Sequence, residues 1–432
     1  MEKVTLFWFR RDLRLFDNHG LSQALAAGFP VLPLFIYDTN ILDGLVDKSD
    51  ARLQFIVNEL ESLHRTLTKF GSRLFTFVGT PPQVFHDLFQ QYDVQLLIAN
   101  RDYEPYAIQR DRLIYDLAKE RGIPFKAYKD QVVLDRKEVL KEDGNPYVVF
   151  TPFSRKWKEV FRQELLQRHP IDLNPKNLVQ ASPQPISGLK EIGFKPVNID
   201  YPDRTIDESI IRNYHQTRDL PGISGTSRLS LHLRFGTISI RELTRKAIQW
   251  NETYLNELIW REFYMMILYH FPRVVHQSFR QEYDRIPWRN DEKEFQAWCE
   301  GRTGYPIVDA GMRQLNESGY MHNRVRMITA SFLTKHLLID WRWGEAYFAR
   351  KLLDYELASN NGGWQWAAGS GVDAAPYFRV FNPELQTKKF DPDHLYIKQW
   401  VAEWNSSAYP EPIVNHKEAR ERAIRVYRNA LQ

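Results

Sequence analysis

The chain has 432 residues, of which 43% are hydrophobic and 26% are charged, which is enough for two or three domains with sizeable cores. No apolar run is long enough to span a bilayer, and the first segment becomes charged within ten residues, which argues against a membrane-spanning protein and a secretory signal. Because the single cysteine, Cys299, excludes an internal disulfide, we expect a cytoplasmic protein, and the net charge of +4 permits a polyanionic partner.

The first 130 residues alternate between strand-like and helix-like segments. Apolar runs at 4–10, 31–37, 73–78 and 94–100 predict strands, and 124–130 is a candidate fifth strand. Residues 51–70 show helical spacing and are followed by Gly71, a typical stop signal. This order predicts an α/β domain with a doubly wound parallel sheet over residues 1–130. No G-x-G-x-x-G dinucleotide fingerprint follows the first strand.

The rest of the chain is predicted to contain a connector and a larger all-helical domain. Residues 131–204 include a long stretch rich in Pro, Ser, Asn and Gly, which is typical of a surface connector. Residues 205–432 show helical spacing with few strand signals, and ten of the 12 tryptophans lie between Trp250 and Trp404. From residue 201 onward there are 23 Arg and only 8 Lys, and Arg suits forked phosphate contacts, although a surface rich in ion pairs explains the numbers equally well.

The loop GISGTSRLS (222–230) has the composition of an anion-binding loop. Two glycines allow backbone N–H groups to approach an anion, and Thr226, Ser227 and Arg228 could add side-chain bonds. Taken alone the signal is weak, because such loops more often cap a helix.

Two helical segments place polar and aromatic side chains on a shared face. Glu257, Trp260, Arg261 and Tyr264 have the spacing i, i+3, i+4 and i+7. They form either a surface ion pair beside a half-buried indole or a wall for a flat ligand with hydrogen-bonding edges, such as a base.

A second face is predicted around Asn323, Arg326 and Met327, beside His322. His322 is more consistent with a structural role than with catalysis. Neither a metal-ligand spacing nor a nucleophile elbow is present, so difficult chemistry would require a bound cofactor. The segment 358–383, with Trp364 and Trp366 among four glycines, is too glycine-rich to predict an ordinary helix.

Several motifs, in this order, resemble the photolyase/cryptochrome family. They are WFRRDLRLFDN at the N-terminus, RLS, WREFY, MHNR, NNGGWQW and DAAPYFRVFNP. The resemblance covers essentially the whole chain, and the helical half is similar to bacterial class I enzymes that repair cyclobutane pyrimidine dimers in DNA. It implies an α/β antenna domain, a connector and a helical FAD domain. It also implies light-driven repair by electron transfer from reduced FAD to a flipped-out dimer, in a monomeric lyase that binds UV-damaged DNA.

The resemblance also assigns roles to residues. Asn360 would face the flavin N5, and Arg326 and Asp354 would pair beside the flavin. Glu257, Asn323 and Met327 would line the dimer pocket, with Glu257 hydrogen-bonded to the dimer. The remaining FAD contacts would be Tyr214, Thr226, Ser227, Arg228, Leu229, Ser230 and Glu356, where many relatives have Asp at the last position. The DNA contacts would be Arg218, Trp260, Arg261, Arg324, Trp366, Arg379 and Gln386, with Trp260 and Trp366 as the apolar wall.

Trp364, Trp341 and Trp288 match the family's chain of tryptophans that carries an electron to oxidised flavin. At two antenna positions where folate-binding relatives have Asn and Glu, this chain has Tyr106 and Ala107. The departure places a folate in doubt, and the second chromophore is left open as a folate, a deazaflavin, another flavin or none.

Three other functions were weighed against dimer repair. A cryptochrome photoreceptor without repair activity is disfavoured by Asn360, since many cryptochromes have Asp or Cys there, and by the end of the chain at Gln432 without a long polar tail. Repair of (6-4) photoproducts is disfavoured because this chain has His322–Asn323 where those enzymes have a His pair. A non-catalytic nucleotide-binding module would leave the ordered tryptophans unexplained.

Overall fold

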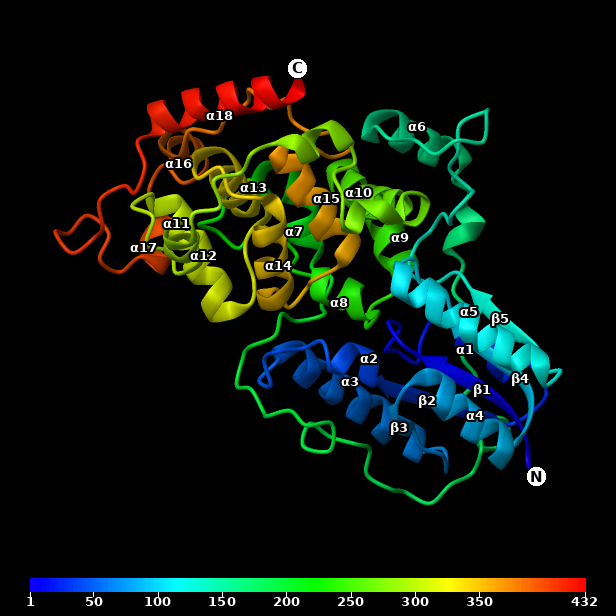
Figure 1. The fold of residues 1–432 in the computed structure, drawn as a ribbon. Coiled ribbons are helices and arrows are strands. Elements are labelled where there is room, and N and C mark those ends of the chain that lie inside the picture. The colour runs from blue at the N-terminus through cyan, green and yellow to red at the C-terminus, as the bar shows by residue number, and fades with distance from the viewer. The chain divides into compact units, whose positions relative to one another are not determined.

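The computed structural model describes residues 1–432, which form two compact units that are both discontinuous in sequence. The first, called here the sheet unit, comprises residues 1–135, 161–205 and 229–246. The second, the helical unit, comprises residues 136–160, 206–228 and 247–432. Figure 1 shows the strands gathered in one unit and most of the helices in the other.

The sheet unit contains one five-stranded parallel sheet in the order β3-β2-β1-β4-β5. All eight residues of β2 are buried, as expected for an inner strand covered on both faces. All five predicted strands are present, so the α/β class is confirmed. The strands are β1 (Lys3–Phe9), β2 (Val31–Asp38), β3 (Phe75–Gly79), β4 (Asp93–Asn100) and β5 (Phe125–Tyr128); the helices between them are α1 (His19–Leu25), α2 (Thr39–Leu42), α3 (Ala51–Thr68), α4 (Pro81–Gln91) and α5 (Pro105–Glu120).

Four buried charges form an ion-pair network in the sheet unit. The guanidinium of Arg14 lies 2.7 Å from one carboxylate oxygen of Asp130, and that of Arg241 lies 2.9 Å from the other. Arg241 also pairs with Asp17 at 3.0 Å. No side chain in the network is more than 4% exposed. The network therefore joins the start of the chain to residue 241, far along the sequence.

The remaining helices belong mainly to the helical unit and surround an aromatic-rich core that includes Trp298, Trp341 and Trp364. They are α6 (Phe150–Val160), α7 (Glu208–Thr217), α8 (Ser230–Phe235), α9 (Ile240–Trp250), α10 (Glu252–His270), α11 (Glu292–Cys299), α12 (Pro306–Ser318), α13 (Asn323–Ser331), α14 (Trp341–Lys351), α15 (Leu357–Ala368), α16 (Pro383–Phe390), α17 (Leu395–Trp400) and α18 (His416–Leu431). Short 3-10 helices occupy Gln163–Leu166, Pro175–Asn177, Pro272–Val275 and Gln281–Arg285, and a π-helical turn occupies Phe332–His336.

The division into units differs from the predicted domain boundaries. The predicted connector, 131–204, is shared: residues 136–160 belong to the helical unit and 161–205 to the sheet unit. Residues 136–160 belong there because α6 is amphipathic and buries Phe153 and Trp157. Residues 229–246, predicted as part of the helical domain, belong to the sheet unit, where Arg241 completes the ion-pair network.

Candidate functional site

Helix α10 carries the first predicted group of site residues. Glu257, Trp260, Arg261 and Tyr264 all lie on this 19-residue helix, as their spacing requires. Arg218 donates a hydrogen bond of 2.6 Å to the Glu257 carboxylate, and both side chains are 28% exposed. Burial raises the pKa of Glu257 above its ordinary value, although the Arg218 guanidinium opposes this shift. Glu257 is therefore a carboxyl group that can be protonated more readily than a free one.

Helix α13 carries the second group, and residues 218 and 219 connect it to the first. Asp219 accepts a hydrogen bond of 2.7 Å from Arg324, while its neighbour Arg218 holds Glu257. The Arg324 guanidinium also lies 3.6 Å from the sulfur of Met327. The structure thus brings Glu257 and Met327 into one connected cluster, with the exposed Asn323 at the first position of α13.

His322 has a structural role at the start of α13. Its Nδ1 accepts a hydrogen bond from the backbone N–H of Arg324, so the imidazole caps the helix. Burial, together with the nearby Arg326 guanidinium, lowers the pKa of His322 to about 4. The ring is therefore neutral at physiological pH, which is the state that the cap requires.

The first part of the glycine-rich segment, residues 358–368, lies in helix α15 (Leu357–Ala368), so the expectation that it would not be helical was wrong there. Tertiary packing overrides the low helix propensity of glycine. A Cβ at Gly362 would lie 2.2 Å from the Tyr264 ring, so only glycine allows α15 to pack this closely against α10. Gly369 ends the helix in the left-handed conformation with φ of 90°.

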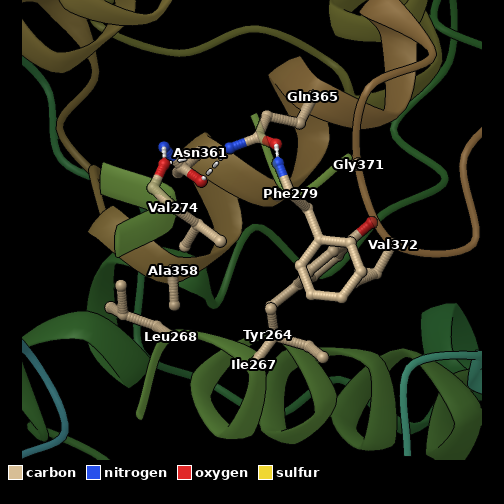
Figure 2. Close-up of a pocket in the computed structure, with 11 residues that line it drawn as sticks. Tyr264, Ile267, Leu268, Val274, Phe279, Ala358, Asn361, Gln365, Gly371 and Val372 are labelled. Carbon is tan, nitrogen blue, oxygen red and sulfur yellow. Dashed lines mark hydrogen bonds between the residues drawn. The ribbon is translucent and has the colours of Figure 1, made fainter. Parts of the chain in front are cut away.

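The two faces of α15 differ. Figure 2 shows the inner face, where Asn361 and Gln365 lie beside a small cavity between α15 and α10. The Gln365 amide accepts a hydrogen bond of 2.7 Å from the backbone N–H of Phe279 and donates one of 3.0 Å to the carbonyl of Val274. Asn361 donates to the same carbonyl at 2.9 Å. These bonds fix α15 from the inside, and sequence reasoning missed both amides because their partners lie about 90 residues earlier in the chain.

The outer face of α15 presents Asn360 and Gly363, which are three residues apart and share that face. A Cβ at Gly363 would meet nothing within 4 Å, so open space borders this part of the helix. The Asn360 amide donates a hydrogen bond of 2.8 Å to the side chain of Glu345 on α14. Glu345, which the sequence did not suggest, therefore sets the orientation of the Asn360 amide. Burial raises the pKa of Glu345, against the opposing effect of this hydrogen bond.

Replacing Glu345 with glutamine is expected to remove a loss of folding stability that occurs as the pH rises. Because the pKa of Glu345 is raised in the folded state, its contribution to stability is fully present below the ordinary value of 4.5 and is lost as the pH rises through the raised pKa. The Glu345→Gln variant keeps an acceptor for Asn360 without that loss. The thermal midpoint of the variant minus that of the wild type should therefore increase by about 2 °C when the pH is raised from 4.5 to 8. The exposed Glu317→Gln serves as control, and a parallel shift in both variants would contradict the prediction.

Other predicted cofactor contacts gather around Tyr254 and Tyr320. Ser227 lies 2.9 Å from the hydroxyl of Tyr254, whose ring packs edge-on against that of Tyr214. The guanidinium of Arg228, a residue in the left-handed region with φ of 52°, stacks over the Tyr320 ring at 4.4 Å.

Arg326 also stacks on Tyr320, at 5.7 Å, and forms a forked ion pair with Asp354 at 2.9 and 3.1 Å. Leu229 and Ser230 belong by their packing to the sheet unit, where Leu229 is buried and Ser230 begins α8.

Arg261 forms an ion pair that the sequence did not indicate. Its guanidinium forms an ion pair of 3.2 Å with Glu356, and the two side chains are only 11% and 7% exposed. The pair joins α10 to the start of α15. Both side chains are therefore largely buried, and the DNA-side role of Arg261 and the flavin contact of Glu356 stay predictions.

Comparisons with known proteins decide the family. A family model described as DNA photolyase matches residues 5–173, and one described as the FAD binding domain of DNA photolyase matches residues 254–408. A deoxyribodipyrimidine photo-lyase from Vibrio cholerae is 39% identical over 99% of this chain and 100% of its own length. The chain belongs to the photolyase/cryptochrome family.

Solved structures of relatives agree with this family fold. A bacterial class III photolyase from Agrobacterium tumefaciens aligns with a TM-score of 0.87 at 34% identity, covering 100% of this chain and 98% of that one. A cryptochrome from Synechocystis sp. PCC6803 aligns with a TM-score of 0.85 at 26% identity, covering 99% of each chain. Both branches of the family are thus structurally close, and the higher identities are to photolyases.

The residues of the helical unit fit FAD, the cofactor named for this family domain. The open space beside Asn360 and Gly363 suits a flat ring system with hydrogen-bonding edges. The exposed Arg228 and the hydroxyls of Thr226 and Ser227 are suitable donors to a phosphate linker. No group of three or more His, Cys, Asp or Glu side chains is placed to hold a metal ion, and no helix is long and apolar enough to cross a membrane.

The three tryptophans predicted to form an electron relay differ in burial. Trp364 and Trp341 are 2% and 1% exposed within one core cluster, and the half-buried Trp288 packs against that cluster. A Cβ at Gly344 would lie 2.1 Å from the Trp364 ring, so this glycine makes room for the indole. The relay itself stays a prediction.

The remaining predicted DNA contacts lie after α15. Arg379 is exposed in the segment between α15 and α16, and Gln386 is a partly buried residue of α16. Trp366, near the end of α15, packs against Phe381 with ring centroids 6.5 Å apart.

Proposed function

We propose that this protein repairs cyclobutane pyrimidine dimers in DNA with the energy of light, as a monomer in the cytoplasm. The observation that carries the proposal is the setting of Glu257, a largely buried carboxyl group held by Arg218 three residues from Trp260, in a chain 39% identical to a photo-lyase over its whole length. The cryptochrome alternative rests on a more distant structural relative and accounts for no feature of this cluster.

The chemistry that reduced FAD would supply when bound is the light-driven transfer of one electron to the dimer, with return of that electron once the two cyclobutane bonds had broken. The chain's own residues bind and orient the substrate. Trp260 and Trp366 offer apolar rings to a flipped-out dimer, and a lesion that already disturbs base stacking is less costly to flip than intact bases. Glu257, in its protonated state, donates a hydrogen bond to a pyrimidine carbonyl, and Asn323 and Met327 complete the pocket.

Other residues hold the cofactor and the DNA backbone. Tyr214, the 226–230 segment, Arg326, Asp354, Glu356 and Asn360 are proposed to surround FAD, with Glu345 orienting the Asn360 amide. Arg218, Arg261, Arg324, Arg379 and Gln386 are proposed on the DNA side. Of these, the exposed Arg379 is best suited to a phosphate, whereas Arg218, Arg261 and Arg324 are engaged in ion pairs. Arg–phosphate contacts make binding weaker at high salt.

We propose that a folate is not the second chromophore. The hydroxyl of Tyr106 donates a hydrogen bond to Asp38 at the end of β2, and Ala107 is 4% exposed, so these positions offer neither the amide nor the carboxylate of the folate-binding relatives. The absorption spectrum of the purified protein tests this directly, because a bound folate adds a near-ultraviolet band beside that of FAD.

The decisive experiment is a repair assay on UV-irradiated oligothymidine. The chemically reduced protein is mixed with the oligonucleotide under blue light, and the recovery of thymine absorbance is followed against a dark control. We expect light-dependent recovery. A lack of recovery by protein that contains reducible FAD would favour the photoreceptor function.

Trp288→Phe is expected to impair photoreduction of oxidised FAD while leaving repair intact once FAD has been reduced chemically. Trp288 is the partly buried member of the predicted relay, so its loss removes the link to solvent. Trp404→Phe is the matched control, since Trp404 is also a partly buried indole packed against the same cluster. Normal photoreduction in Trp288→Phe would exclude it from the relay.

A further inference from the structure

The strongest feature outside the predicted site is a ring stacked on Trp260. Phe150, the first residue of α6, lies parallel to the Trp260 indole with ring centroids 3.7 Å apart and an interplanar angle of 7°. Phe263 meets the same indole edge-on at 5.6 Å, and Tyr264 lies at 5.5 Å. One face of Trp260 is therefore covered by a residue that the sequence placed in the connector.

Contacts along the whole of α6 fix the position of Phe150. The indole N–H of Trp157 donates a hydrogen bond of 2.6 Å to Glu262, and Phe153 packs against Phe263 at 5.2 Å. At the other end of the helix, Lys158 pairs with Glu252 at 2.7 Å. These contacts join α6 to α10 at three points, so they hold α6 in place and position Phe150 on Trp260.

A second contact holds the backbone of Phe150. Its backbone N–H donates a hydrogen bond of 3.3 Å to Asp373, which lies between α15 and α16 in the stretch that also carries Arg379. A carboxylate at the first turn of a helix is favourable because it accepts from a free N–H group and faces the positive end of the helix dipole. Phe150 is thus fixed by two segments as well as by its own ring contact.

We propose that Phe150 is a positioning residue for damaged DNA, which acts by fixing the plane of Trp260 before substrate arrives. This role rests on the proposed function, in which Trp260 is an apolar wall for the flipped dimer. A half-buried indole without support loses side-chain freedom when it binds a ligand, and that loss weakens binding. The stacked phenyl ring removes most of this freedom in advance. The gain in binding is specific to the flipped-out dimer, because contacts to the DNA backbone do not involve Trp260.

The test is dark binding of the FAD-loaded protein to an oligothymidine with one dimer and to the same undamaged strand, measured by fluorescence anisotropy. For Phe150→Leu we expect about three- to tenfold weaker binding to the damaged strand, the range expected for loss of an aromatic pair. Binding to the undamaged strand should not change. Phe150→Tyr keeps a flat ring and should restore the wild-type ratio. Phe150→Met, which has similar volume but no ring, gives the same comparison if the leucine variant is unstable.

Phe153→Leu is the matched control, since Phe153 is buried on the same helix but does not touch Trp260. We expect it to lower the thermal midpoint and retain the preference for damage. The positioning role would be overturned if Phe150→Leu and Phe153→Leu lost the preference for damaged DNA equally, or if Phe150→Leu lost none of it. In either case a wild-type protein that prefers the damaged strand would still support the proposed function. A wild-type protein without any preference for the dimer would overturn both.

Discussion

Replacing Glu257 with alanine is expected to lower the yield of repair per absorbed photon at least about threefold, because a charge-assisted or carboxyl hydrogen bond to the reacting pyrimidine is lost. FAD content should be unchanged, since the cofactor residues lie around Tyr254 and Tyr320. The measurement is the quantum yield of thymine recovery with chemically reduced protein. The exposed Glu317→Ala on α12 is the control and should repair normally. Unchanged repair in Glu257→Ala would remove this residue from the mechanism.

The protonation state of Glu257 adds a pH test. Burial raises its pKa, so the protonated carboxyl that can donate to a pyrimidine carbonyl is lost as the pH rises through the raised value. Wild-type repair should therefore decline with increasing pH. Glu257→Gln offers an amide donor at every pH, so its profile should be flatter than that of the wild type. Identical profiles would indicate that the proton on Glu257 is not used.

Asp130→Asn is expected to destabilise the protein by about 3–5 kcal/mol, because it leaves the buried guanidinium groups of Arg14 and Arg241 without their common anion. Burial alone would raise the pKa of Asp130, but the two arginines outweigh it and hold the pKa below the ordinary value of 3.8. The stabilisation is therefore present above that value and is lost as the pH falls through the lowered pKa.

Urea denaturation of the full chain, followed by circular dichroism, measures this effect. Asp116→Asn is the control, because Asp116 forms an exposed pair with Arg112 that should contribute less than about 1 kcal/mol. If Asp130→Asn and Asp116→Asn had the same free energy of unfolding, the stability of the sheet unit would not depend on the ion-pair network.

The sequence predicts the features that follow from local patterns. The apolar runs identify all five strands, and the spacing of Glu257, Trp260 and Arg261 places them on one helix, because a strand or helix imposes its period on its own residues. The FAD and dimer-pocket assignments came from family motifs rather than from spacing.

The features that the sequence did not predict depend on contacts between distant segments. The helix α15 forms because the Tyr264 ring fits against Gly362, which propensity cannot indicate. Glu345 and Phe150 act on Asn360 and Trp260 from other elements, so neither has a local motif. Arg261 likewise looks like a surface residue until Glu356 is seen beside it.

The buried network of the sheet unit also affects the order of events during synthesis. All five strands have been translated once Tyr128 is made, yet Asp17 and Asp130 still lack Arg241, which is translated more than 100 residues later. Until then the Asp17 carboxylate lacks its arginine partner, and the Asp130 carboxylate can pair only with Arg14. Folding from the N-terminus thus cannot finish before residue 246 emerges, and a released fragment that ends at residue 130 should bind chaperones far more strongly than one that ends at residue 250.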